Sequence, residues 1–297
     1  MSEWDLVSYV KSRAKPHPRL KQGIGDDTAV LAGHPEEILA TIDSLMDGVH
    51  FLTDTTKPEA IGYKALAVSL SDIAAMGGQA ETALLSLSIP KHLSSSWIKR
   101  LCDGAFELAD SFGVSLCGGD TTSWRGPLVV TTAVYGKPHE KGPLLRSTAK
   151  AGQLICVSGP LGGSLKRGRH LKFKPRLHEV KELLDTCEPS SMIDISDGLA
   201  SDLRHICDLS QCGAMLYRNA IPVHEDAKSD NDDTAIRAAM TDGEDFELCF
   251  TMPENQRLLL ESLSFKNYVI GKTIEQSGLF WDDASPIHLK GYEHRFA

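Results

Sequence analysis

The feature that most constrains the fold is a break at residues 136–152, where glycines, prolines and charges interrupt the apolar patterns on either side. Before the break, apolar spacing predicts strands at 37–43, 82–89, 114–117 and 128–135, and helices at 58–76 and 94–112. After it, we expect strands at 154–157, 192–195, 214–216 and 246–251, and helices at 199–209 and 254–263. The pattern therefore predicts an α+β or α/β chain with two domains, 1–138 and 150–297.

Acidic residues stand beside glycine or a small residue at six points, several of them directly after an apolar strand. The six are Gly25-Asp26-Asp27, Thr41-Ile42-Asp43, Ser71-Asp72, Gly118-Gly119-Asp120, Asp194-Ile195-Ser196-Asp197-Gly198 and Asp242-Gly243-Glu244-Asp245. One Gly-Asp pair is usually a turn, but carboxylates at several strand ends can meet in one crevice. Oxygen ligands without His or Cys suit Mg²⁺, and glycines let backbone N–H groups approach phosphates. This series predicts a magnesium and phosphate site.

The common phosphate-binding and nucleophile motifs are missing from the sequence. It contains no G-x-x-x-x-G-K-[ST], no G-x-G-x-x-G and no G-x-S-x-G. The nearest candidate, residues 159–164, follows a strand, but Lys166 is misplaced. It is therefore either a phosphate loop or a tight strand-to-helix turn. Metal ions, not a covalent nucleophile, are expected to carry the chemistry.

Composition excludes several classes of protein. The net charge is −9 and no Lys/Arg-rich block occurs, which argues against a nucleic-acid surface. The acidity fits either a solvated surface or a cation-binding site. The seven cysteines are odd in number and form no C-x-x-C, so we expect reduced thiols in a cytoplasmic protein. Residues 1–10 lack a signal-peptide pattern, and no apolar run approaches the ~20 residues of a membrane span.

The motifs, taken in order, resemble those of the thiamine-monophosphate kinases. The strings are GIGDD at 23–27, Asp43 followed by GVHF at 48–51, YKALAVSLSDIAAMG at 63–77, GGDTT at 118–122, ISDGL at 195–199, GEDFEL at 243–248 and KGYEHRF at 290–296. The resemblance covers essentially the whole chain. The block at 63–77 is specific, whereas the short Gly-Asp pieces are not.

The resemblance implies a fold shared with aminoimidazole ribonucleotide synthetase. In that fold the N-terminal half gives four strands to an eight-stranded barrel at a homodimer interface, and an α/β C-terminal half packs beside it. The implied reaction is ATP plus thiamine monophosphate giving ADP plus thiamine diphosphate. ATP and thiamine monophosphate are then the small-molecule partners, and several Mg²⁺ ions are the cofactors.

The resemblance also implies a role for each matching residue. Family Mg²⁺ ligands fall on Asp27, Thr41, Ile42 (through its backbone), Asp43, Asp72, Asp120, Asp194 and Asp197. Among these, the acids expected to matter most for catalysis are Asp43, Asp72, Asp120 and Asp197. ATP contacts fall on Gly119, Asp120, Arg146 and Ser196. Contacts with the acceptor fall on His50, Glu244 and Phe296.

Physical chemistry is consistent with these roles, although some residues have a second interpretation. Transfer to an existing phosphate brings two polyanions together, so cations must cancel their repulsion. Arg146 suits bidentate contact with phosphate, or it is a solvated linker residue. His50 is either a polar contact or a structural histidine. Phe296 either stacks on a cationic ring or packs on the core.

Three departures from the family pattern concern the nucleotide and acceptor sites. Ile42 stands where a hydroxyl residue is expected, Ser123-Trp124 are inserted near the expected ATP site, and the basic segment 163–188 is short. The alternatives are another ATP-dependent enzyme of the superfamily, such as one like aminoimidazole ribonucleotide synthetase, or a non-catalytic metal- or nucleotide-binding protein. The first cysteine, Cys102, comes too late for a selenophosphate synthetase, and the chain lacks the C-terminal Cys of hydrogenase-maturation relatives.

Overall fold

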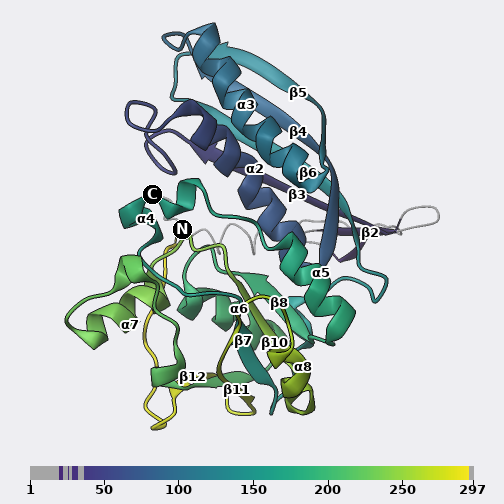
Figure 1. The fold of residues 1–297 in the computed structure, drawn as a ribbon, viewed down its shortest axis with the longest axis vertical. Coiled ribbons are helices and arrows are strands. Elements are labelled where there is room, and N and C mark those ends of the chain that lie inside the picture. The colour runs from purple at the N-terminus through teal and green to yellow at the C-terminus, as the bar shows by residue number, and fades with distance from the viewer. Residues whose placement is uncertain (1–19, 23–25, 27–28, 33–36, 294–297) are drawn as a thin grey trace.

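The computed structural model describes residues 20–22, 26, 29–32 and 37–293, which form two β-sheets with helices between and around them (Figure 1). Both sheets are mixed, and each half of the chain supplies one. No helix in these ranges is long and apolar enough to cross a membrane.

The first sheet has six strands in the order β1-β2-β3-β6-β4-β5. Their bounds are β1 Leu20–Gln22, β2 Ala29–Ala32, β3 Glu37–Met46, β4 Gly78–Pro90, β5 Ser115–Trp124 and β6 Val129–Pro138. All neighbours are antiparallel except β4 and β5. Among the described residues the sheet is open, and two short strands, β1 and β2, extend the four long ones.

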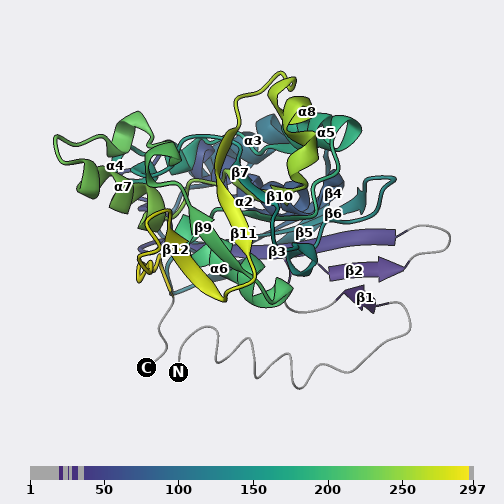
Figure 2. The same cartoon turned by 90° about the horizontal axis from the view of Figure 1, so that it is seen from below.

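Helices α2 (Pro58–Ala75) and α3 (Ser95–Phe112) lie on one side of this sheet (Figure 2). Burial alternates along β6 because its even-numbered residues face these helices. α3 is amphipathic and has the predicted ends, since Ser94 accepts a bond from the Trp97 N–H and Gly113 adopts φ +67°. The opposite face carries exposed apolar side chains at Ile42, Met46 and Tyr135.

The second sheet has the order β12-β9-β11-β7-β10-β8. Its strands are β7 Leu154–Val157, β8 Ser191–Asp194, β9 Gly213–Leu216, β10 Leu248–Met252, β11 Tyr268–Ile274 and β12 Gly278–Trp281. The helices of this half are α4 Ser164–Arg167, α5 Leu177–Thr186, α6 Leu199–Ser210, α7 Asp232–Thr241 and α8 Arg257–Glu261, with short 3₁₀ turns between them. Strands β7, β8 and β10 are buried at every position.

Helix α2 joins the two halves. It is buried on nearly every side, unlike the amphipathic α3. Its middle packs in the core of the first half, while Ala74 and Ala75 pack with Val180 of α5 and Phe250 of β10 in a core of the second half. The C-terminal end of α2 is therefore fixed against the second sheet, which matters for the site below.

Most predicted elements are present, and the differences are local. The strand predicted at 114–117 runs on to Trp124 because its backbone pairs with β4 as far as Pro90. The helix predicted at 254–263 is split into a 3₁₀ turn and α8. Helices α5 and α7 were not predicted, and α7 begins inside 224–233, a segment expected to be a mobile loop. All seven cysteines are free, five of them buried.

Candidate active site

Helix α2 holds two of the predicted acids through short polar contacts. The Ser69 hydroxyl donates to Oδ2 of Asp43 over 2.7 Å, which fixes the carboxylate of β3 against the helix. Thr41, two residues earlier on the same face of β3, donates to Oδ2 of Asp72. Strand β3 and helix α2 thus present two carboxylates and a hydroxyl side by side.

Ser71, the residue before Asp72 in α2, reaches the second half. Ser71 donates its hydroxyl hydrogen to Oδ2 of Asp194 over 2.6 Å, and both side chains are buried. Asp194 ends β8, and the loop after it is held by Asp202, whose Oδ2 accepts the N–H groups of Asp197 and Gly198 at 3.1 Å each. Burial, followed by the negative charges of Asp197 and Asp194, raises the pKa of Asp202 well above its usual value. Negative charge is therefore crowded here, which a bound cation would relieve.

A cavity of about 360 Å³ opens beside these acids, at the junction of the two halves. Five predicted site residues line it, together with several apolar side chains. The five are Asp43, His50, Ser196, Asp197 and Glu244, and the apolar residues include Leu45, Val49, Val68, Leu165, Phe246 and Tyr292. The cavity could hold a ligand that combines an anionic group with an apolar ring.

His50 has the structural role considered for it and also lies at the cavity. Its Nδ1 accepts the N–H of Met46 over 3.0 Å and so closes the turn after β3, in which Gly48 adopts φ +85°. His50 also lines the cavity. A turn of this kind places the ring at the cavity edge with little freedom to move.

Glu244 adopts φ +65°, a conformation rare outside glycine. Its backbone N–H donates to the Ser196 carbonyl over 2.7 Å, which ties the two acidic loops together. Its carboxylate pairs with Lys64, and His170 Nδ1 lies 3.3 Å from its Oε2. Burial alone would raise the pKa of Glu244, but His170 and Lys64 lower it below its usual value, so the side chain stays charged.

Arg146 approaches the same region from the linker between the halves. Its backbone N–H donates to Oδ1 of Asp26 over 2.9 Å, and its carbonyl accepts from Ser210 over 2.8 Å. The positive charge of Arg146 also acts on the pKa of Asp202, which it lowers. The Arg146 backbone is therefore held by both halves, and because its side chain is only 12% exposed it is not a freely solvated linker residue.

Gly119 and Asp120 do not join the other acids within one chain. Strand register places Asp43, Thr132, Leu85 and Gly119 in one row across β3, β6, β4 and β5. Three strand spacings separate the ends of that row, about 14 Å. Asp120 is the next residue of β5, so its side chain points to the sheet face opposite α2. Both residues are exposed.

Asp27 and Phe296 lie outside the described residues. The Ile42 side chain is 68% exposed on the open face of the first sheet, pointing away from α2. The side chain of Ile42 is therefore not part of the acidic group, which leaves only its backbone for the role implied by the family.

The glycine-rich segment after β7 is a strand-to-helix turn, one of the two interpretations left open. The N–H of Gly162 donates to Asp245 over 2.8 Å and that of Gly163 to Asp242 over 3.0 Å. Carboxylates of the protein occupy these donors, so they are not presented to a phosphate. Burial raises the pKa of Asp245 to about 7, against the lowering effect of the Gly162 bond and of Arg169.

Residues that could hold a metal are grouped loosely. Within the described ranges no three His, Cys, Asp or Glu side chains meet closely enough to hold one ion. The donors that do lie together, Asp43, Asp72 and the Thr41 hydroxyl, are all hard oxygens. Mg²⁺ takes one or two protein carboxylates and completes its shell with water and substrate phosphates, so this donor set fits it.

Sequence reasoning missed the residues that hold the acids in place. These are Ser69, Ser71, Asp202, Lys64 and His170. Ser69, Ser71 and Lys64 lie within the specific block at 63–77. Polar side chains on a helix that is otherwise small and apolar were the available signal, since buried polar groups need partners.

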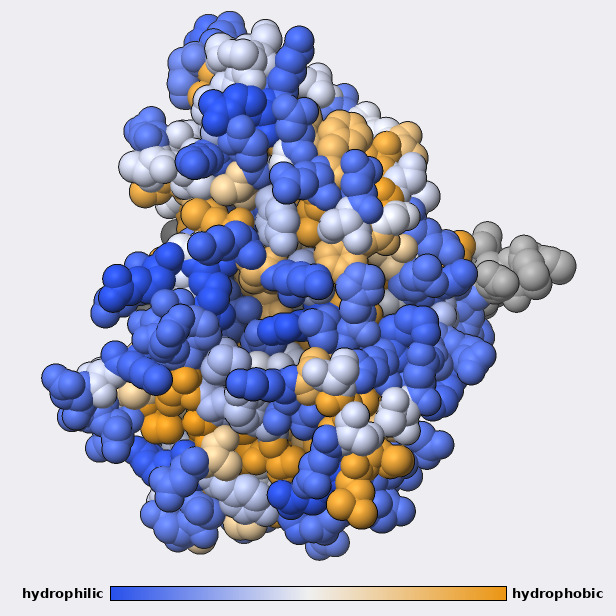
Figure 3. Space-filling model, in the orientation of Figure 1, coloured by the Kyte–Doolittle hydropathy of each residue, from blue (hydrophilic) through white to orange (hydrophobic). Residues whose placement is uncertain are grey.

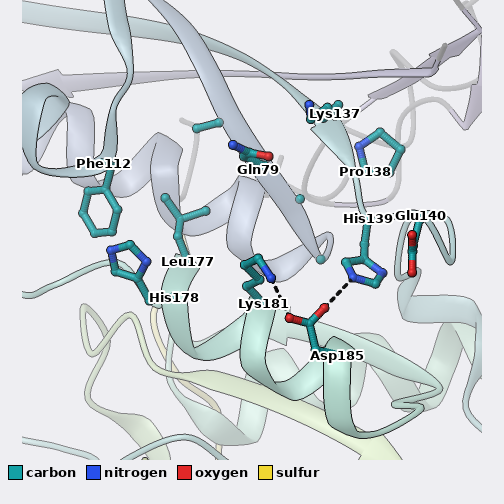
Figure 4. A pocket seen from close by; sticks show the side chains of 13 residues that line it. Gln79, Phe112, Lys137, Pro138, His139, Glu140, Leu177, His178, Lys181 and Asp185 are labelled. Atoms are coloured by element: carbon teal, nitrogen blue, oxygen red, sulfur yellow. Dashed lines mark hydrogen bonds and ion pairs between the residues drawn. The ribbon is translucent and has the colours of Figure 1, made fainter.

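A second cavity, of about 470 Å³, lies between the first sheet and α5 (Figure 4). His178 stacks on Phe112 with ring centroids 5.1 Å apart, and Asp185 lies between Lys181 and His139 at 2.5 and 3.2 Å. None of the predicted site residues lines this cavity. In the orientation of Figure 1, the molecular surface is mostly hydrophilic, and apolar side chains form separate groups on it (Figure 3).

Comparison with known proteins places the chain among kinases of a thiamine ester. Residues 25–137 match the family described as AIR synthase related protein, N-terminal domain. Thiamine-monophosphate kinase of Rhodopirellula baltica is 33% identical over 291 residues, covering 94% of this chain and 91% of that protein. The Escherichia coli enzyme of the same name is 38% identical over 303 residues, covering 92% and 91%. A solved structure described as AaThiL complexed with AMPPCP and TMP superimposes with a TM-score of 0.87 at 27% identity, covering 99% and 97%.

Proposed function

Because this chain belongs to the thiamine-monophosphate kinase family, we propose that it transfers the γ-phosphoryl group of ATP to thiamine monophosphate, giving thiamine diphosphate and ADP. The observation that carries the proposal is the cavity at the junction of the two halves, which Asp43 and His50 line from the first half and Asp197 and Glu244 from the second. Its carboxylates suit metal-bound phosphates, and an acid beside apolar side chains suits a cationic ring.

Magnesium ions are the proposed cofactors, and when bound they supply charge neutralisation for the phosphates. The residues proposed to hold them are Asp27, Thr41, Ile42 through its backbone, Asp43, Asp72, Asp120, Asp194 and Asp197. The hydroxyl contacts from α2 support this assignment for Asp43 and Asp194, because they orient each carboxylate before any ligand arrives.

For the nucleotide we propose Gly119, Asp120, Arg146 and Ser196, and for the acceptor His50, Glu244 and Phe296. Arg146 is a cation held between the halves, which suits contact with a phosphate. Glu244 keeps its negative charge inside the cavity wall, which favours a cationic acceptor ring. Tyr292 lines the same cavity close to the chain end that carries Phe296.

We also propose a homodimer in which the open faces of two first sheets close a shared barrel. The apolar side chains exposed on that face support this, and so does β5, whose outer edge has no partner strand among the described residues. Asp120 and Gly119 would then serve the partner's site. The domain division 1–138 and 150–297 is part of the proposal, and so is a cytoplasmic location, which the seven free cysteines support.

The direct test is to incubate the protein with ATP, Mg²⁺ and thiamine monophosphate and to look for thiamine diphosphate. We expect stoichiometric ADP and thiamine diphosphate, with no product when Mg²⁺ is chelated. Formation of ADP with no phosphorylated thiamine product would show that the acceptor is wrong. No turnover of ATP with any phosphate ester would favour the non-catalytic alternative.

A further inference from the structure

Lys64 of α2 is the most deeply buried charged side chain at the junction of the halves, with no exposed surface. Its ammonium group lies 2.9 Å from the carbonyl oxygen of His50 and 2.9 Å from Nδ1 of His170, and it forms an ion pair with Glu244. When His170 carries its proton on Nε2, each of the three ammonium hydrogens has one acceptor; when Nδ1 carries the proton, His170 donates to Glu244 instead. These acceptors come from three separate segments of the chain.

Two of those three segments form the cavity wall. His50 and Glu244 line the cavity, whereas Lys64 lies behind them. Lys64 therefore sets two wall residues at once without touching a ligand itself. Asp72 stands eight residues later on the same helix. Helix α2 therefore carries Lys64, which contacts the cavity wall, and Asp72, a proposed metal ligand, about 12 Å apart along its axis.

The third segment holds the loop that carries Glu244. Arg169 donates to Asp245 over 2.9 Å, Phe173 stacks on Phe246 with ring centroids 4.1 Å apart, and Arg176 pairs with Glu247. Together with His170 beside Glu244, segment 169–176 contacts four consecutive residues, 244–247. The short basic segment that departs from the family pattern is thus a brace for this loop.

A buried ion pair is weak support for a purely stabilising role. Removing two charges from water costs several kcal/mol per ion, and apolar replacements of such pairs are often as stable. Burial lowers the pKa of Lys64, while Glu244 opposes that shift, so the charge is kept by its partner and not by solvent. The Lys64 charge is costly to bury, and it lies directly behind the wall of the ligand cavity. A role in fixing the position of the Glu244 carboxylate accounts for it better than a purely stabilising role.

We propose that Lys64 is a positioning residue for the acceptor: it holds the Glu244 carboxylate and the His50 turn in the geometry that binds the thiamine ring. This rests on the proposed function, in which the acceptor occupies the cavity beside Glu244. Lys64 acts only through the residues it holds. Its loss should therefore weaken acceptor binding and leave the nucleotide side largely unchanged.

The test measures KM for thiamine monophosphate, KM for ATP and kcat in Lys64→Met, Glu244→Gln and the double variant. We expect Lys64→Met to raise KM for thiamine monophosphate about tenfold or more, because a charge-assisted contact is lost, with KM for ATP within about twofold. The double variant should be no worse than the poorer single variant, because both changes remove the same contact. Calorimetric binding of thiamine monophosphate gives the same comparison without turnover.

Lys141→Met is the matched control. Lys141 also crosses between the halves, donating to the carbonyls of Leu184 at 2.5 Å and Cys187 at 3.3 Å, but it lies away from the cavity. We expect it to lower the melting temperature and to leave both KM values unchanged. If Lys64→Met does not fold, His170→Gln carries the same test, with the same expected rise in KM for thiamine monophosphate.

The proposal is overturned if the folded Lys64→Met variant keeps its wild-type KM for the acceptor, if both KM values rise equally, or if the two single effects multiply in the double variant. Failure of the proposed function is distinguishable from these results, because the unsubstituted enzyme would then make no thiamine diphosphate.

Discussion

The two sheets differ in how they are covered. Strands β7, β8 and β10 of the second sheet are buried at every position, with core clusters on both of their faces. In the first sheet, β6 buries alternate residues and β3 buries only Leu39 and Leu45, and Ile42, Met46 and Tyr135 are exposed. The second half thus completes its core within one chain, whereas the first half keeps an apolar face that a second copy can cover.

The largest effect on activity is expected from substitutions between the covered face of the first sheet and α2, where Asp43 and Asp72 lie. Asp43→Ala and Asp72→Ala should each lower kcat on the order of 10³-fold, because each removes a carboxylate proposed to hold the Mg²⁺ that would neutralise the transferring phosphate. Circular dichroism should show an intact fold. Asp185→Ala, in the second cavity, is the control and should keep full activity. If either alanine variant keeps near wild-type turnover at saturating Mg²⁺, the substituted acid is not part of the catalytic site.

The open face should supply the missing acid from a second chain. Asp43→Ala and Asp120→Ala are each expected to be inactive alone. Mixed and re-associated, they should recover about a quarter of wild-type activity, because half of randomly formed dimers are mixed and each has one intact site. No recovery in a mixture that demonstrably contains mixed dimers would mean that each chain builds its own site.

A charge on the open face should separate the two copies. Ile42→Lys places an ammonium group within the apolar face and should shift the sedimenting species from dimer to monomer at micromolar concentration. Leu258→Lys is the matched control, because Leu258 is 80% exposed on α8 in the second half. A dimer that survives Ile42→Lys would show that the subunits associate elsewhere.

The smallest effect concerns the half that is complete within one chain. Burial, with the charges of Arg146 and Arg204, lowers the pKa of His205 in α6 from 6.5 to about 4. The neutral ring therefore stabilises the fold above pH 6.5, and this contribution, at most about 3 kcal/mol, is lost as the pH falls towards 4. His205→Gln should make the unfolding free energy less dependent on pH between 6.5 and 4. The same change is expected in the Ile42→Lys background, in which the protein should be a monomer. The exposed His92 serves as the control position; an unchanged slope in His205→Gln would contradict this assignment.

The sequence predicts elements well where local signals agree. The helix after Ser94 has a cap, an apolar stripe and a terminal Gly113, and all three are present in the structure. Helix α5 was missed although Val180, Leu183 and Leu184 have helical spacing. The strand through 118–122 had no local signal, because glycine, aspartate and threonine read as a turn. Its conformation comes from pairing with β4.

For the site, the acids were predictable one by one but their grouping was not. Carboxylates beside glycine are visible in a sequence, whereas Ser71 and Asp194 meet only because the end of α2 packs into the second half. The same holds for Lys64 and Glu244, which are 180 residues apart. Asp120 was grouped with the others by motif alone, and strand register places it on the opposite face.

The shared packing of α2 has a consequence for how the chain is made. Ala74 and Ala75 find their apolar neighbours on α5 and on strands that extend to β10. At the usual pace of synthesis, roughly 9 to 35 s pass between the emergence of this turn and that of Phe250. Until Phe250 has emerged, the helix end lacks part of its cover from the second half. We therefore expect the protein to acquire protease resistance in one late step, not half by half.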